Sequence, residues 1–139
     1  MSTVSTLPRE VGGLVATGAP CWRHWRSGPV RLVDGAPVTL PDTEENQAAY
    51  PQSSRHKPGL RFPICRVVAL LCLGSGALLD AAVGPCEGEG SDEQSLLRDI
   101  LDSLQNGDIL RGDALCATRF LLWELIRSGK GVVAVFHTS

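Results

Sequence analysis

Apolar residues with helical spacing mark two stretches in the second half of the chain. In the first stretch they form a single stripe made of Leu96, Leu97, Ile100, Leu101 and Leu104, the pattern of one buried helix face. Ser91, with Gln94 three residues later, is a capping-box pattern and predicts that this helix begins at Ser91, while Asn106-Gly107 ends it. The second stretch runs to Gly129 and predicts a helix with Leu121, Trp123 and Leu125 in the core.

Short apolar runs bounded by turn residues predict strands. Pro29–Asp34 is rich in β-branched and apolar residues and is stopped by Asp34-Gly35. Ile64–Leu73 is nearly continuous in apolar residues, as in a strand buried on both faces, and Gly74-Ser75-Gly76 turns it back into Ala77–Val83, which predicts a hairpin. Two further strands are predicted at Asp108–Gly112 and Val132–Phe136.

The remaining segments have weaker patterns. The region up to Gly28 has little periodicity beyond a short helix before Ala19-Pro20. Pro41–Pro63 contains four prolines and many polar residues, which predicts an irregular segment that is too long for an idle connector. We therefore expect a poorly defined N-terminal segment, residues 1–28, followed by one domain, residues 29–139.

The order of these elements predicts the fold class. A strand, a long loop and a hairpin are followed by helix, strand, helix and strand, which indicates an α/β sheet that is mixed at one side and parallel at the other. The length of 139 residues suits one compact domain.

Charge is distributed unevenly along the chain. Residues 1–66 carry eight Lys or Arg against five acidic residues, whereas residues 67–139 carry five against ten. The net charge of −2 excludes a uniformly basic protein that coats nucleic acid, but it allows a local basic surface.

The polar start Met1–Glu10 is unlike a signal peptide, and no apolar run reaches the roughly 20 residues of a membrane span, so we expect a soluble protein. Five cysteines without a C-x-x-C pair favour a reducing compartment over a disulfide framework or a zinc site.

Two aspartates each follow a predicted strand. Asp34 ends the first strand, and Asp113 ends the strand after the capped helix. Functional groups collect beyond the carboxyl ends of strands in open α/β sheets. Two carboxylates that meet there repel each other unless a cation or a shared proton neutralises them, and oxygen ligands select Mg²⁺ or Mn²⁺. An aspartate after a strand is also a common turn or cap residue, and this simpler interpretation stays open.

Several longer motifs occur in an order that resembles the DDE transposases of bacterial insertion sequences (insertion-sequence family 4). They are Leu32–Gly35, Pro41–Gln47, Tyr50–Gln52, Lys57–Gly59, Phe62-Pro63, Gly88–Gln94 and Gly107–Ala114. The resemblance implies a ribonuclease-H-like mixed sheet flanked by helices, incomplete at the C-terminus. It implies that Asp34 and Asp113 are the first two catalytic aspartates and hold Mg²⁺ or Mn²⁺. Its substrate would be DNA at transposon ends, cut and joined by phosphoryl transfer, in a parent that forms a homodimer in the bacterial cytoplasm at the nucleoid.

The chain departs from the family pattern at its end. The family's third carboxylate is a Glu on a helix after a further strand, and the sequence stops at Ser139 before such an element. The expectation is a transposase fragment, truncated at both ends and inactive alone. Two alternatives stay open. One is a non-catalytic remnant that only binds DNA or a partner. The other is a doubly wound nucleotide-binding domain, although the glycine-rich Gly84–Ser91 lacks the lysine of a phosphate loop.

Basic residues in two segments are candidates for contact with DNA. Arg55, His56, Lys57 and Arg61 lie in the irregular segment that follows Asp34. Arg23 and Arg26 alternate with aromatic residues in Trp22–Arg26, a composition that suits stacking on bases and neutralising phosphates. The same cluster could instead pack against the first strand, with the arginines reaching out to solvent.

Overall fold

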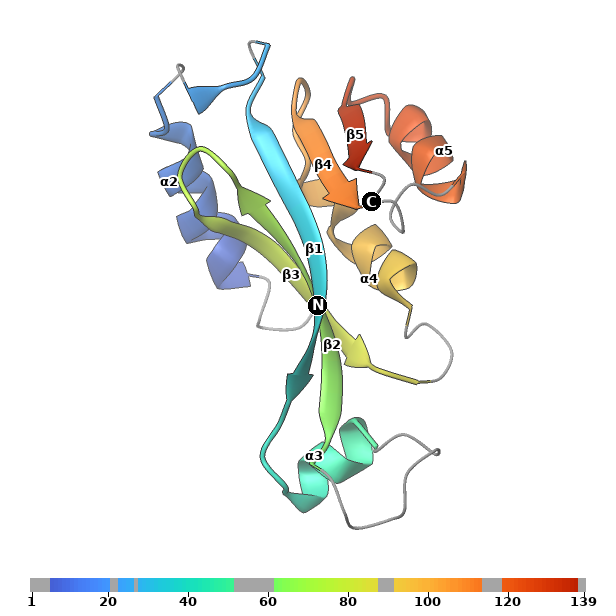
Figure 1. Cartoon of the computed structure of the whole chain (residues 1–139). Coiled ribbons are helices and arrows are strands. Elements are labelled where there is room, and N and C mark those ends of the chain that lie inside the picture. Colours follow the sequence, from blue (N-terminus) through green and yellow to red (C-terminus); the bar gives the residue numbers. More distant parts are fainter. Residues whose placement is uncertain are drawn as a thin grey trace.

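A five-stranded sheet is the centre of the fold in the computed structural model (Figure 1), and its strand order is β3-β2-β1-β4-β5. The structure describes residues 6–20, 23–26, 28–51, 62–87, 92–113 and 119–137. β1 pairs antiparallel with β2, which pairs antiparallel with β3, whereas β1, β4 and β5 are parallel. The predicted α/β sheet, mixed at one side and parallel at the other, is therefore confirmed. The strands are β1 Val30–Thr39, β2 Ile64–Cys72, β3 Leu78–Pro85, β4 Ile109–Asp113 and β5 Val133–His137.

The β2–β3 hairpin is confirmed, with a turn that contains Gly76 at a φ of 73°. Burial along β2 largely alternates, because one face packs on the core while the other is half-buried. β2 is therefore not buried equally on both faces, as its nearly continuous apolar run predicted.

β1 differs from its prediction, because it does not stop at Asp34-Gly35. The strand continues to Thr39, where each residue pairs with β2, up to Thr39 opposite Ile64. A partner strand far away in the sequence therefore overrides the local turn signal. Beyond Leu32 β1 has no ladder with β4, and an edge segment of this kind tolerates Pro37, which has no amide to donate.

The capped helix, α4 (Glu93–Ile100), is confirmed, but its predicted ends are wrong. The capping residue is Asp92, whose carboxylate accepts the Ser95 amide at 2.8 Å, and not Ser91 with Gln94. Asp92 has the extended backbone that a capping side chain needs. At the other end the helix tightens into η3 (Leu101–Ser103), and the extended backbone of Leu104 stops it before Asn106-Gly107.

The second predicted helix is α5 (Arg119–Ser128), which ends at Gly129 with a φ of 64°. Leu121 and Leu125 are buried as predicted, but Trp123 is 53% exposed and does not belong to the core. Two residues on a helix turn the side chain by about 200°, so Trp123 points away from the face that Leu121 and Leu125 share. The Arg127 guanidinium stacks on its exposed ring, 5.3 Å from the centroid.

Pro41–Pro63 is less irregular than predicted. It contains α3 (Glu44–Ala49), whose first turn is acidic and whose capping residue Thr43 accepts the Asn46 amide at 3.2 Å. Residues 52–61 lie outside the described part of the chain.

The predicted N-terminal helix is confirmed as η1 (Pro8–Gly12) and α2 (Gly13–Thr17), which lie beside β3 (Figure 1). Gly12 approaches β3 so closely that a Cβ there would be 1.9 Å from the Leu78 carbonyl oxygen. The described part of residues 1–28 thus packs on the same sheet as the rest of the chain.

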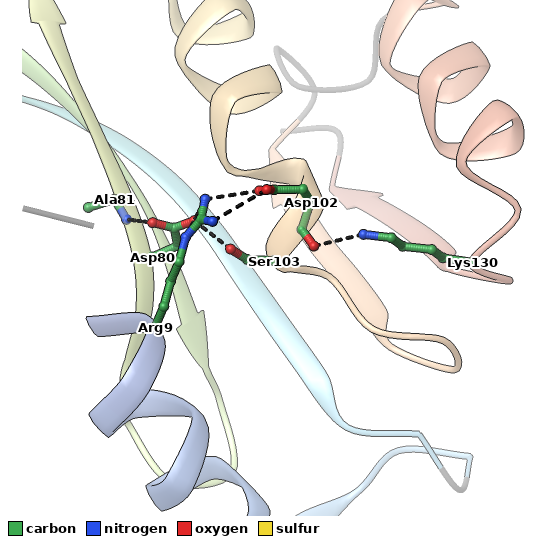
Figure 2. A network of polar contacts seen from close by, with 6 residues as sticks. All are labelled: Arg9, Asp80, Ala81, Asp102, Ser103 and Lys130. Carbon is green, nitrogen blue, oxygen red and sulfur yellow. Dashed lines mark hydrogen bonds and ion pairs between the residues drawn. The ribbon is translucent and has the colours of Figure 1, made fainter. Parts of the chain in front are cut away.

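A network of charged groups also joins this helix to β3 and η3 (Figure 2). Arg9 donates to the fully buried carboxylate of Asp80 at 2.8 Å and to that of Asp102 at 2.9 and 3.3 Å. The Asp80 hydrogen bond is the main reason that the pKa of Arg9 is raised, against the opposing effect of burial. Ser103 and the Ala81 amide also donate to Asp80.

One face of the sheet packs with α4 and α5 to form the core. Each residue of the core exposes less than one-tenth of its surface, and the core consists of Val33, Val68, Leu70, Cys72, Leu79, Ala82, Leu96, Leu97, Ile100, Leu104, Leu110, Leu121 and Leu125. Most of the predicted α4 stripe is therefore buried, and Leu101 packs against it. Within the described residues, no helix is long and apolar enough to span a membrane.

Candidate metal centre

Asp34 and Asp113 lie on adjacent parallel strands, β1 and β4. The β1–β4 ladder pairs Val30 with Ile109 and ends with Leu32 opposite Arg111. Asp34 and Asp113 each lie two residues beyond this ladder, where β1 pairs with β2 and β4 pairs with β5. Asp34 thus lies inside β1 rather than at its tip, while Asp113 is the last residue of β4.

Both aspartates belong to the sheet face opposite the core. Val33 and Leu110 point into the core against α4, and side chains alternate along a strand. Asp34 and Asp113 therefore point away from α4, and both are exposed. Arg111, two residues before Asp113, is exposed on the same face and adds one positive charge beside the two carboxylates.

The backbone around Asp34 is tightly arranged. The Gly35 amide donates to Asp34 Oδ1 at 2.9 Å, so the carboxylate bends back over its own strand. On the other side of β1, the Glu93 carboxyl group from α4 lies against Gly35, where a Cβ would be 3.0 Å from Glu93 Oε1. Glycine at position 35 therefore leaves room for Glu93, which faces the core side of the sheet and not the Asp34–Asp113 side.

The Asp34–Asp113 pair offers only oxygen ligands. Magnesium in proteins is often held by one or two carboxylates, and water or substrate phosphates complete its octahedral shell. Two adjacent exposed carboxylates fit this role for one hard divalent cation. Within the described residues there is no group of three or more His, Cys, Asp or Glu side chains placed to hold a metal ion. The described cysteines Cys65, Cys72 and Cys86 are free thiols.

The structure describes two of the six predicted DNA-contacting residues, Arg23 and Arg26. Arg55, His56, Lys57 and Arg61 lie outside the described residues. Arg23 donates to the Gly74 carbonyl oxygen at 2.6 Å and so contacts the β2–β3 turn. The Arg26 guanidinium stacks on the ring of Trp25, 4.9 Å from its centroid.

Sequence reasoning missed Arg111, the cation closest in register to the two aspartates. Its position two residues before Asp113 could have revealed it, because residues at i and i+2 of a strand share a face. Glu93 could not have been found in this way, because only the packing of α4 on β1 brings it to Gly35.

Comparisons of the chain with protein-family models, with curated proteins and with solved structures find no match.

Proposed function

We propose that this chain carries a ribonuclease-H-like core of the DDE transposase type, in which Asp34 and Asp113 hold a divalent cation against DNA. The observation that supports it most is the parallel pairing of β1 and β4, which ends two residues before the exposed Asp34 and Asp113 on the two strands. The mixed sheet flanked by helices and the motifs that carry the family resemblance support the same proposal.

In this proposal the protein's own groups bind and position the reacting phosphodiester. Asp34 and Asp113 supply carboxylates on the exposed sheet face, and the Gly35 amide donates to one oxygen of Asp34. Arg111 offers a guanidinium on the same face, a group suited to phosphate oxygens. When bound, Mg²⁺ or Mn²⁺ would supply Lewis-acid stabilisation of the phosphodiester oxygens in phosphoryl transfer. Two carboxylates outweigh one guanidinium, so we expect DNA to bind this face only when a divalent cation is present.

The experiment measures DNA binding and strand cleavage by the full chain, with fluorescently labelled oligonucleotides and with Mg²⁺, Mn²⁺ or EDTA. We expect metal-dependent binding that is lost in both Asp34→Asn and Asp113→Asn. Asp99→Asn removes an exposed carboxylate on α4 and serves as the matched control, with binding equal to that of the unchanged chain. Binding that persists in EDTA, or that survives both substitutions, would contradict the proposal.

A second candidate function is DNA binding through the shared cation without strand cleavage. It is favoured by the number of carboxylates, because two exposed aspartates follow the β1–β4 ladder, whereas the resemblance implies a set of three. The same assay separates the two functions. Cleavage products that depend on Asp34 and Asp113 support the enzyme, while metal-dependent binding without products supports the binding module.

A further inference from the structure

A cavity of about 720 Å³ lies between the N-terminal helices and the core face of the sheet. Its walls come from η1 and α2, the start of β1, β3 and η3. Arg9, Glu10, Arg31 and Asp102 are charged residues of this wall, and Gly13 and Leu79 also line the cavity. Sites for small ligands occupy roughly 300–1,000 Å³, so the cavity has the size of a ligand site.

Arg31 is the unusual group in this wall. Its side chain is only 10% exposed, and its Nε donates to Asp108 Oδ1 at 3.0 Å. The other oxygen of Asp108 accepts the Gln105 amide at 2.8 Å. Arg31 Nη1 is buried and has no hydrogen-bond partner among the described residues. A guanidinium carries five N–H donors, and a buried donor without an acceptor is costly. Because Arg31 lines the cavity, an anionic acceptor that contacts its guanidinium from the cavity would lower this cost.

The other charged groups of the wall limit the charge of an acceptor. Arg9 is engaged by Asp80 and Asp102 (Figure 2). Glu10 and Asp102 add two carboxylates to the wall, and His24 is the remaining titratable side chain there. These carboxylates repel a dianion more strongly than a monoanion. Apolar groups, among them Leu14, Ala16 and Leu79, cover much of the rest of the wall and favour a ligand with an apolar body.

We propose that this cavity binds a small carboxylic acid with an apolar body, whose carboxylate pairs with Arg31. The site is separate from the Asp34–Asp113 pair. Arg31 and Asp34 are three residues apart on β1, so their side chains point to opposite faces of the sheet. The proposal therefore does not depend on the proposed function, and the two can fail independently.

The test is a titration of the full chain with hexanoate and benzoate, followed by amide chemical shifts in NMR spectra. Hexanol and benzyl alcohol are the neutral counterparts, and inorganic phosphate is the anion without an apolar body. We expect saturable shifts at millimolar concentration for the two carboxylates and none of comparable size for the alcohols or for phosphate. Arg31→Lys keeps the charge but removes the planar fork, and we expect binding about tenfold weaker.

A second variant tests the cavity without disturbing the ion pair of Arg31 and Asp108. A Cβ at Gly13 has no atom within 4 Å, so Gly13→Phe places a ring in open space of the cavity. We expect this variant to fold, as shown by unchanged circular dichroism, and to lose hexanoate binding. Val15→Phe is the matched control, because Val15 is 49% exposed on α2 and does not line this cavity; it should bind like the unchanged chain.

Four results would overturn the proposal. The first is no saturable shift with either carboxylate, and the second is equal binding of the alcohols. The third is binding of hexanoate to folded Gly13→Phe with the affinity of the unchanged chain. Phosphate binding as strong as hexanoate binding would also overturn it, because the apolar body would then have no role.

Discussion

Replacement of Arg9 by Met tests how far the charged network in Figure 2 fixes the N-terminal helix. The substitution retains most of the aliphatic stem and removes the guanidinium that bridges Asp80 and Asp102. Asp80 is fully buried, so its carboxylate then lacks a counter-charge in the core. Removing one partner of a buried ion pair costs about 3–5 kcal/mol. Ser103 and the Ala81 amide still donate to Asp80, so we expect a value near the lower end, about 3 kcal/mol.

The contact with Asp102 contributes much less. Asp102 is 67% exposed, and an exposed ion pair is worth about 0–1 kcal/mol. Asp102→Asn is therefore the matched control, with an expected loss below about 1 kcal/mol. The double variant Arg9→Met/Asp80→Leu removes both buried charges, and we expect it to recover much of the stability lost in Arg9→Met, because an apolar pair leaves no carboxylate unpaired.

Urea denaturation followed by circular dichroism gives the free energy of unfolding for all four chains. The reasoning would be refuted if Arg9→Met lost no more than Asp102→Asn. It would also be refuted if Asp80→Leu lowered the stability of Arg9→Met further, as a second independent substitution would. The two residues would then not be coupled.

Three further substitutions test the local packing and capping that position the helices. Gly12→Ala should destabilise the chain by about 1–3 kcal/mol in urea denaturation, because its Cβ would meet the Leu78 backbone. Gly35→Ala should cost less than about 1 kcal/mol, because its Cβ meets the movable end of the Glu93 side chain and not backbone. Equal losses of stability in Gly12→Ala and Gly35→Ala would contradict this reasoning. Asp92→Ala should lower stability by about 1 kcal/mol at pH 7. Hydrogen bonds from Ser95 lower the pKa of Asp92 in the folded chain. The stabilisation by Asp92 is therefore fully present above the unfolded pKa of about 3.9, and it is lost as the pH falls through the lower folded pKa. A stability difference between the unchanged chain and Asp92→Ala that grows on acidification would contradict this reasoning.

Local patterns predicted those elements whose signals lie within a few residues. The stripe from Leu96 to Leu104 places α4, and Gly129 ends α5 where the sequence indicates. The Asp34-Gly35 turn signal failed, because β2, about thirty residues later, pairs with β1 beyond it. The amphipathic pattern of α5 did not show that Trp123 is exposed, because in sequence a large aromatic residue looks the same in the core as on the surface. The structure shows the exposed Trp123 ring covered by Arg127.

The ion pairs around the cavity were not predictable from single residues. Arg9 and Asp80 are 71 positions apart, and Arg31 and Asp108 are 77 apart. Only the strand order brings these partners together, and no spacing in the sequence marks them. The sequence shows that Asp34 and Asp113 follow apolar runs, but it does not show the parallel β1–β4 ladder that ends two residues before both of them.

The most direct test of the Asp34–Asp113 site is cleavage of the polypeptide by iron bound there. Fe²⁺ is added to the full chain with ascorbate and hydrogen peroxide, and the cut positions are mapped by mass spectrometry. A shared cation predicts cuts near both residue 34 and residue 113, suppressed by excess Mg²⁺ and lost together in either Asp34→Asn or Asp113→Asn. Cuts near only one of the two aspartates, or cuts that survive both substitutions, would contradict a shared metal site.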